Sequence, residues 1–341
     1  MMNFEEFKEK LAGDVKEAME EKGGQKVTVE PRTVEKMNET YEGLTVKPDE
    51  GEIGVNLNLD SLYQEYNSGT SYDSIVNKAA AIAIEALENR PDFDIESFKD
   101  YDKMKSTLAI EIVSAERNRS TLETVPHKEI EDMAVVYRFI ISEGPLSGTG
   151  SILVTNQMLD NYGITAEQLH EDAIRNAPEI RPLVIEGMAE VLAKQMGVED
   201  LEMLGLNFPP EQEQMFVASV EGNVHGAGVI AYQNFMDEAA QRAGGSFFIL
   251  PSSIHEVLII PDNGKFDTAS LEQMVREVNA TTVELSDQLT DSVYHYDADT
   301  KVFELAEKFD ERAATKEADI SKADKAKEVT KPHRDRGGEA I

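Results

Sequence analysis

The chain has 341 residues, of which 40% are hydrophobic, so it can bury the core of one large domain or two medium ones. It has no cysteine, which excludes disulfides, a cysteine nucleophile and cysteine-ligated zinc or iron–sulfur sites. Its 33 basic and 66 acidic residues give a formal charge of −33, which repels nucleic acid and anionic membrane surfaces.

These properties predict a globular protein that binds neither DNA nor membranes directly. The first residues, MMNFEEFKEK, lack the basic-then-apolar order of a signal peptide. No apolar run approaches the ~20 residues that span a bilayer. We therefore expect a cytoplasmic protein. Because the acidic residues are spread along the whole chain, a generally acidic protein is favoured over a mimic of DNA. An acidic decoy of a nucleic-acid-binding protein remains an alternative.

The first sixty residues show helical spacing and then strand patterns. Apolar residues recur every three or four positions from Phe4 until Gly23, behind an Asn-x-x-Glu capping pair, which predicts an amphipathic helix. Short strand patterns follow at residues 26–30, 43–47 and 53–59. We expect a small sheet with one exposed face.

The next part of the chain alternates helices and strands. The patterns predict helices at residues 60–69, 71–90, 94–105, 165–177 and 183–196, and strands at 108–113, 133–141 and 151–155. The order strand, short helix, glycine, capped helix occurs twice, at residues 55–79 and 152–177. Either an old internal duplication or the chance recurrence of strand–helix units explains this order.

A linker is predicted at residues 205–214, where Pro209-Pro210 interrupts regular structure. The residues after it predict a strand at 215–220, a helix at 229–243, strands at 247–250 and 257–260, a helix at 267–278, and a hairpin at 292–296 and 302–305. From about Arg312 the composition turns to Lys, Glu, Asp and Ala without aromatic residues. This composition is typical of a disordered segment.

We therefore expect an α+β fold of two packed lobes, each with small mixed sheets covered by helices. The boundary is placed near Leu206. The N-terminal lobe would comprise residues 1–206, the C-terminal lobe residues 207–311 with a central strand pair, and residues 312–341 a disordered charged tail.

The central strand pair carries the most concentrated polar chemistry. Between its two apolar runs stands Pro-Ser-Ser-Ile-His-Glu, and a later strand reads Tyr-His-Tyr-Asp. We predict a functional surface from Ser252, Ser253, His255, Glu256, Tyr294, His295 and Asp297. Serine, histidine and a carboxylate are the materials of nucleophilic catalysis, so a hydrolase using Ser252 or Ser253 with His255 is one alternative.

Two observations weaken the catalytic alternative. Neighbouring strand residues point to opposite faces, so His255 and Glu256 diverge unless the turn extends through them. Serines at a turn also satisfy main-chain groups, and His255 can pair locally without any function. We assign no catalytic residue.

Other motifs are incomplete. The letters HEVLI lack the second histidine of a zincin, because Ile259 stands in its place. Residues 226–231 fit G-x-G-x-x-A, but no acidic residue follows the next strand to bind a ribose. His225, His255 and His295 could gather around a metal, although their spacing does not require it. We expect neither a metal nor a cofactor.

Several segments resemble an uncharacterised family of bacterial cytoplasmic proteins, described as a domain of unknown function and often found in anaerobes and near mobile elements. The resemblance covers residues 3–308 and rests on YEGLTV, LDSLYQEYNSGTS, VPHKEIEDMAVVYR, SILVTNQMLDNYGITAEQLHEDAIRNAP and FFILPSSIHEVLIIPD, with PSSIHE as the most specific signature. A second uncharacterised family is similar in segment order. Neither resemblance implies an activity. The leading hypothesis is a non-enzymatic cytoplasmic binding or regulatory protein with a protein partner.

Overall fold

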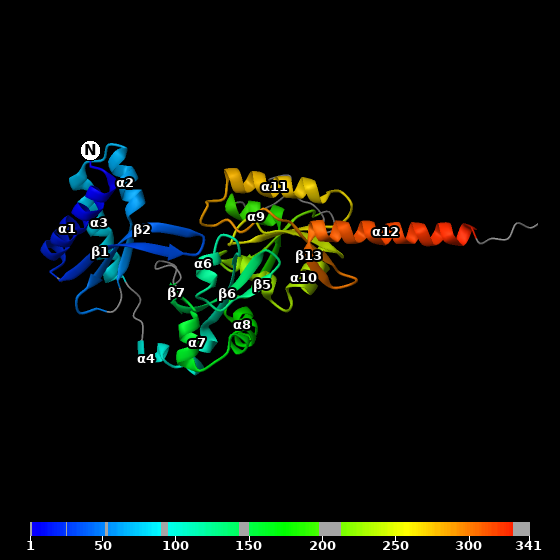
Figure 1. Cartoon of the computed structure of the whole chain (residues 1–341), viewed down its shortest axis with the longest axis horizontal. Coiled ribbons are helices and arrows are strands. Elements are labelled where there is room, and N and C mark those ends of the chain that lie inside the picture. The colour runs from blue at the N-terminus through cyan, green and yellow to red at the C-terminus, as the bar shows by residue number, and fades with distance from the viewer. Residues whose placement is uncertain are drawn as a thin grey trace, which may run out of the picture. The chain divides into compact units, whose positions relative to one another are not determined.

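The computed structural model (Figure 1) describes residues 2–24, 26–51, 54–89, 95–142, 150–197 and 213–329. They form two compact units. Unit 1 comprises the chain up to residue 182 together with residues 284–288, and unit 2 comprises residues 183–283 together with the chain from residue 289. Both units combine antiparallel sheets with helices, so the predicted α+β class is confirmed.

The N-terminal part of unit 1 is a three-stranded sheet with three helices. Its elements are α1 (Phe4–Gly23), β1 (Val27–Lys36), β2 (Glu39–Pro48), β3 (Val55–Asn58), α2 (Leu59–Asn67) and α3 (Tyr72–Glu88). The predicted capping pair of Asn3 and Glu6 begins α1. Apolar residues at successive helical turns, from Phe7 to Met19, are buried against the sheet and α3. Each fully buried large apolar side chain contributes about 1.5–3 kcal/mol, which makes this stripe the main support of α1.

The rest of unit 1 is a four-stranded antiparallel sheet in which the central strand pairs with the three others. Its elements are α4 (Ile95–Phe98), α5 (Tyr101–Met104), the 3₁₀ helix η1 (Lys105–Thr107), β4 (Leu108–Ser114), α6 (Arg119–Leu122), β5 (Lys128–Ile130), the central β6 (Met133–Ser142), β7 (Gly150–Leu153), α7 (Asn156–Tyr162) and α8 (Ala166–Ile180). The predicted repeated order is present in β3-α2-α3 and in β7-α7-α8. In both, a glycine with positive φ, Gly69 or Gly163, separates the two helices.

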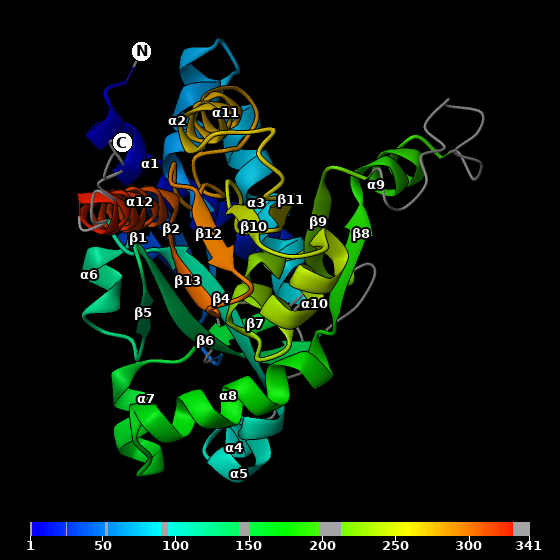
Figure 2. The ribbon, with the colours of Figure 1, turned by 90° about the vertical axis from the view of Figure 1, so that its right-hand side faces the viewer.

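Unit 2 is built on one six-stranded antiparallel sheet with the order β13-β12-β10-β11-β9-β8 (Figure 2). Its elements are β8 (Leu183–Gly187), α9 (Met188–Gln195), β9 (Phe216–Val220), the 3₁₀ helix η4 (Gly226–Ala231), α10 (Phe235–Ala243), β10 (Phe247–Leu250), β11 (Val257–Pro261), α11 (Thr268–Thr281), β12 (Tyr294–Asp297), β13 (Val302–Leu305) and α12 (Ala306–Val329).

The predicted central strand pair is confirmed as β10 and β11. They pair in an antiparallel register that sets Phe247 opposite Pro261 and Leu250 opposite Leu258. Both strands have a neighbour on their other side as well, β12 for β10 and β9 for β11. All four residues of β10 are buried, which explains why its sequence is continuously apolar rather than alternating.

The start of unit 2 differs from the prediction. Residues 183–187, expected to open a helix, form β8 instead, because Leu183 pairs with Val220 in a strand far along the chain. The boundary expected near Leu206 lies outside the described residues, and the division between the units falls after residue 182.

The C-terminal segment begins with α12, which includes residues 312–329 of the predicted charged tail, and residues 330–341 lie outside the described part. Alanine, glutamate and lysine are strong helix formers. A composition with too few apolar residues for a core can therefore still form a helix.

Candidate functional site

The segment between β10 and β11, residues 251–256, is called the joint here, and main-chain hydrogen bonds hold it. Ser253 is 7% exposed, and its Oγ accepts a hydrogen bond from the N–H of His255 at 3.0 Å. The carbonyl of Ser252 accepts one from the N–H of Leu289 at 3.2 Å. The Ser253 side chain thus satisfies a main-chain N–H of the turn, and Ser252 contributes its main-chain carbonyl.

The end of β9 and the loop after it, residues 221–225, pack closely against the joint. Ser219 donates its Oγ hydrogen to the carbonyl of His255 at 2.7 Å. A Cβ on Gly226 would overlap Ser219 Oγ and lie 2.5 Å from the carbonyl oxygen of His255. Only glycine allows this approach, so position 226 is set by packing rather than by a nucleotide-binding loop.

Two residues of this loop, Asn223 and His225, adopt the left-handed conformation with φ of 55° and 54°. For a residue other than glycine this costs roughly 1 kcal/mol or more, and such strain concentrates at functional sites. The left-handed conformation directs the N–H of His225 to Nδ1 of His255, at 3.2 Å. The two imidazole rings lie side by side, with centroids 5.5 Å apart.

This hydrogen bond decides where His255 carries its ring hydrogen. A neutral imidazole has one N–H, so Nδ1 as an acceptor leaves the hydrogen on Nε2. His255 is therefore a hydrogen-bond donor at Nε2. A metal ion needs a lone pair on the ligating nitrogen, and this tautomer has none on Nε2.

The same contacts bear on the alternative that the protein is a hydrolase. A nucleophilic serine needs a hydrogen bond from its hydroxyl to a ring nitrogen of the histidine. Ser253 Oγ instead accepts a hydrogen bond from the main-chain N–H of His255. Nδ1 of the His255 ring accepts one from the main-chain N–H of His225. For Ser253, the contacts are those of a turn residue.

Strand β12 places its predicted site residues inside unit 2. Tyr294 and His295 are 0% and 1% exposed, and they point to opposite faces of the sheet. Tyr294 stacks on Phe303 of β13, with ring centroids 5.3 Å apart. Among the predicted site residues, Ser252, His255 and Glu256 of the joint and Asp297 of β12 are half-buried and retain surface.

His295 has a polar contact at one ring nitrogen and aromatic contacts over its faces. Its Nε2 donates to Asp262 Oδ2 at 3.0 Å. The ring of Phe309 in α12 stacks on the imidazole with ring centroids 3.6 Å apart, and the ring of Phe248 lies edge-on with centroids 5.0 Å apart. Burial lowers the pKa of His295, although Asp262 opposes this shift. Nδ1 has no hydrogen-bond partner among the described residues. The ring is therefore neutral at physiological pH.

Asp297 is tied to the turn after β12 and to α12. Hydrogen bonds from Thr300, and then from Asp299 and Arg312, lower the pKa of Asp297 to about 2. Arg312 also contacts Glu304, with its Nε 2.8 Å from Oε1. Asp297 is thus an ionised structural residue that helps to hold α12 on the sheet.

Residues 4–298 match a protein-family model described as a family of unknown function, DUF5688. The chain belongs to the DUF5688 family. No curated protein and no solved structure matches the chain. The DUF5688 match includes the joint, the loop after β9 and β12, and it ends before β13 and α12.

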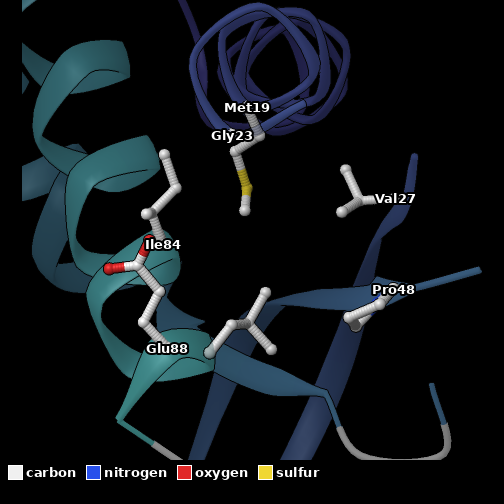
Figure 3. A pocket seen from close by; sticks show the side chains of 7 residues that line it. Met19, Gly23, Val27, Pro48, Ile84 and Glu88 are labelled. Carbon is white, nitrogen blue, oxygen red and sulfur yellow. The ribbon is translucent and has the colours of Figure 1, made fainter. Parts of the chain in front are cut away.

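The DUF5688 chain has a small apolar pocket in unit 1 and a polar groove in unit 2. In Figure 3, Met19 and Ile84 reach into the space between α1 and α3, with Val27 and Pro48 on its other side. This pocket has a volume of about 120 Å³, well below the 300–1,000 Å³ of ordinary ligand sites. The groove in unit 2 has about 1040 Å³ and is lined in part by Asp262.

The three-histidine metal site considered from the sequence is not formed. His225 and His255 lie together, whereas His295 pairs with Asp262. Across the described ranges, no three His, Asp or Glu side chains are grouped to hold a metal ion. None of the helices in those ranges combines the length and the apolar character that crossing a membrane requires.

The sequence did not identify Ser219, Gly226 or Asp262 as site residues. Asp262 belongs to an Asp-Asn-Gly triplet, which is typical of a turn, and this pattern gave no reason to expect its contact with His295.

Proposed function

We propose that this member of DUF5688 is a cytoplasmic, non-enzymatic binding protein that recognises a protein partner through the histidine site, defined as residues 221–225 and 252–256. One observation carries the proposal. The N–H of His225 donates to Nδ1 of His255, so that the half-buried His255 ring carries its hydrogen on Nε2 and an oxygen of a bound partner would accept from it. The strain at His225 is maintained for this contact.

The charges of the histidine site favour a neutral partner group. Glu221 and Glu256 lie within the site, and the chain carries a formal charge of −33. Both repel phosphates and carboxylates. A donor in acidic surroundings is satisfied best by an uncharged oxygen, such as a main-chain carbonyl or a side-chain amide of a protein. The same charge argues against nucleic acid as the partner.

Two substitutions of His255 separate recognition from folding. In His255→Asn the amide oxygen takes the place of Nδ1 and still accepts from His225, but no donor remains at the position of Nε2. In His255→Gln the amide N–H takes the place of Nε2, and the internal acceptor is lost. We expect His255→Asn to keep the unfolding free energy within about 0.5 kcal/mol, and His255→Gln to lose about 1 kcal/mol.

The measurement is recovery of the partner by tagged full-length chain from cell extract, followed by a binding titration with the purified partner. His255→Asn should lose the partner and His255→Gln should retain it. His127→Asn, which removes an exposed imidazole from unit 1, is the matched control and should bind like the unmodified chain. If His255→Asn retains every partner, the histidine site supports only the fold and the proposal fails.

A further inference from the structure

The groove in unit 2 shares no residue with the histidine site. It is formed by three segments: residues 213–216 before and in β9, residues 238–246 at the end of α10 and the turn after it, and residues 261–263 at the end of β11. Its volume of about 1040 Å³ suits a small molecule or a short peptide segment. Its lining is largely polar, with Gln214, Gln241, Ser246 and Asn263 among its residues.

Negative charge predominates in the groove. Glu213, Glu238 and Asp262 line it together with Arg242, and the ammonium of Lys265 donates to the lining residue Gln214 at 2.5 Å. Helix α10 also ends there, at Gly244 in the left-handed conformation. The carbonyl groups of a helix C-terminus carry partial negative charge. Both features favour a cation.

The carboxylate of Asp262 is hydrogen-bonded to a side chain, His295, that does not neutralise its charge. This carboxylate is 28% exposed, and Oδ2 accepts the Nε2 hydrogen of His295 at 3.0 Å. His295 is 1% exposed and lies against Phe309 and Phe248, an environment in which an imidazolium is unfavourable. The contact thus joins an anion to a neutral ring. It fixes the orientation of the carboxylate and leaves its charge available to the groove.

We propose that the groove binds a ligand that carries a primary ammonium group, with Asp262 as the anchoring residue and His295 as the residue that positions it. An ammonium has three N–H donors and no acceptor, which matches carboxylate, amide and carbonyl oxygens. The ammonium belongs either to a free polyamine or to a lysine side chain of a peptide.

The proposal is tested by calorimetric titration of the full-length chain in about 150 mM NaCl, where the Debye length is about 8 Å and non-specific attraction is weak. The probes are spermidine and an acetylated, amidated peptide with one lysine. Asp262→Asn retains an oxygen that accepts from His295, so the fold is kept while the charge is lost. We expect Asp262→Asn to bind whichever probe the unmodified chain binds at least tenfold more weakly.

The matched control is Asp299→Asn, which removes the same charge from an exposed residue of unit 2 outside the groove lining. It should bind like the unmodified chain. Binding of spermidine alone assigns a free polyamine, and binding of the lysine peptide alone assigns a peptide. If neither probe binds, or if Asp262→Asn and Asp299→Asn bind equally, the attraction is that of the overall charge and the proposal is overturned.

Discussion

Substituting alanine for Gly226 tests how closely the loop after β9 packs against the joint. The added Cβ would overlap Ser219 Oγ and lie 2.5 Å from the His255 carbonyl oxygen and 2.9 Å from Val220 N. The last two atoms belong to the main chain and cannot rotate away. The loop must therefore move away from the joint.

The expected cost follows from the contacts that this movement weakens. Overpacking in a tight interior costs about 1–3 kcal/mol. The hydrogen bonds from Ser219 Oγ to the His255 carbonyl and from His225 N–H to His255 Nδ1 are each worth about 1 kcal/mol. Allowing for overlap between these effects, we expect Gly226→Ala to destabilise unit 2 by about 3 kcal/mol.

Hydrogen exchange measured by mass spectrometry reports on the two units separately. Peptides from β9, β10 and β11 should exchange about 100-fold faster in Gly226→Ala, since 1.4 kcal/mol corresponds to a factor of ten. Peptides from β4 and β6 of unit 1 should be unchanged. As a matched control, Gly13→Ala adds a Cβ in α1 with no atom within 4 Å, and should stabilise that helix by about 0.5–1 kcal/mol.

The reasoning is refuted if β10 and β11 exchange as slowly in Gly226→Ala as in the unmodified chain. A second check uses the double substitution with Ser219→Ala. Removing the hydroxyl relieves one of the three close contacts, while the two main-chain contacts persist. The double variant should therefore recover only part of the lost protection, and full recovery would show that the main chain is not rigid there.

Two further predictions concern pH. Because its hydrogen bonds lower the pKa of Asp297 to about 2, this carboxylate stabilises unit 2 above pH ~4, and about 1–2 kcal/mol should be lost as the pH falls from about 4 to 2. Acid unfolding of Asp297→Asn should show a shallower slope in that range, and an equal slope would contradict the assignment. Because burial lowers the pKa of His295, the unfolded chain takes up a proton first, so unit 2 should lose stability as the pH falls below about 6.5. His295→Gln retains a donor to Asp262 and should lose this dependence, as measured by denaturation at pH 7 and pH 5.

Local patterns in the sequence predicted many of the elements. The capping pair at Asn3, the two strand–helix–glycine–helix segments and the strand pair around the joint were all confirmed. Each depends on residues within one turn or one strand, which is the range over which caps and periodicity act. Residues 183–187 could not be assigned this way, because they form a strand only by pairing with β9.

The candidate site shows the same division. The joint was identified as a polar turn between two apolar strands, and the contacts within it are local. The burial of Tyr294 and His295 depends on strand order and on the docking of α12. Asp262 resembled a simple turn residue for the same reason. Pattern analysis does not show which face of a strand a distant helix covers.

The sequence by itself determined the α+β class, the acidic character, the exclusion of cysteine chemistry and the position of the joint, because composition and short-range periodicity are enough for these. Only the tertiary structure decided that His255 accepts from the main chain of His225 and that His295 holds Asp262 beside a groove. Both contacts join residues about thirty positions apart. They exist because antiparallel pairing and packing bring those segments together, which no local pattern encodes.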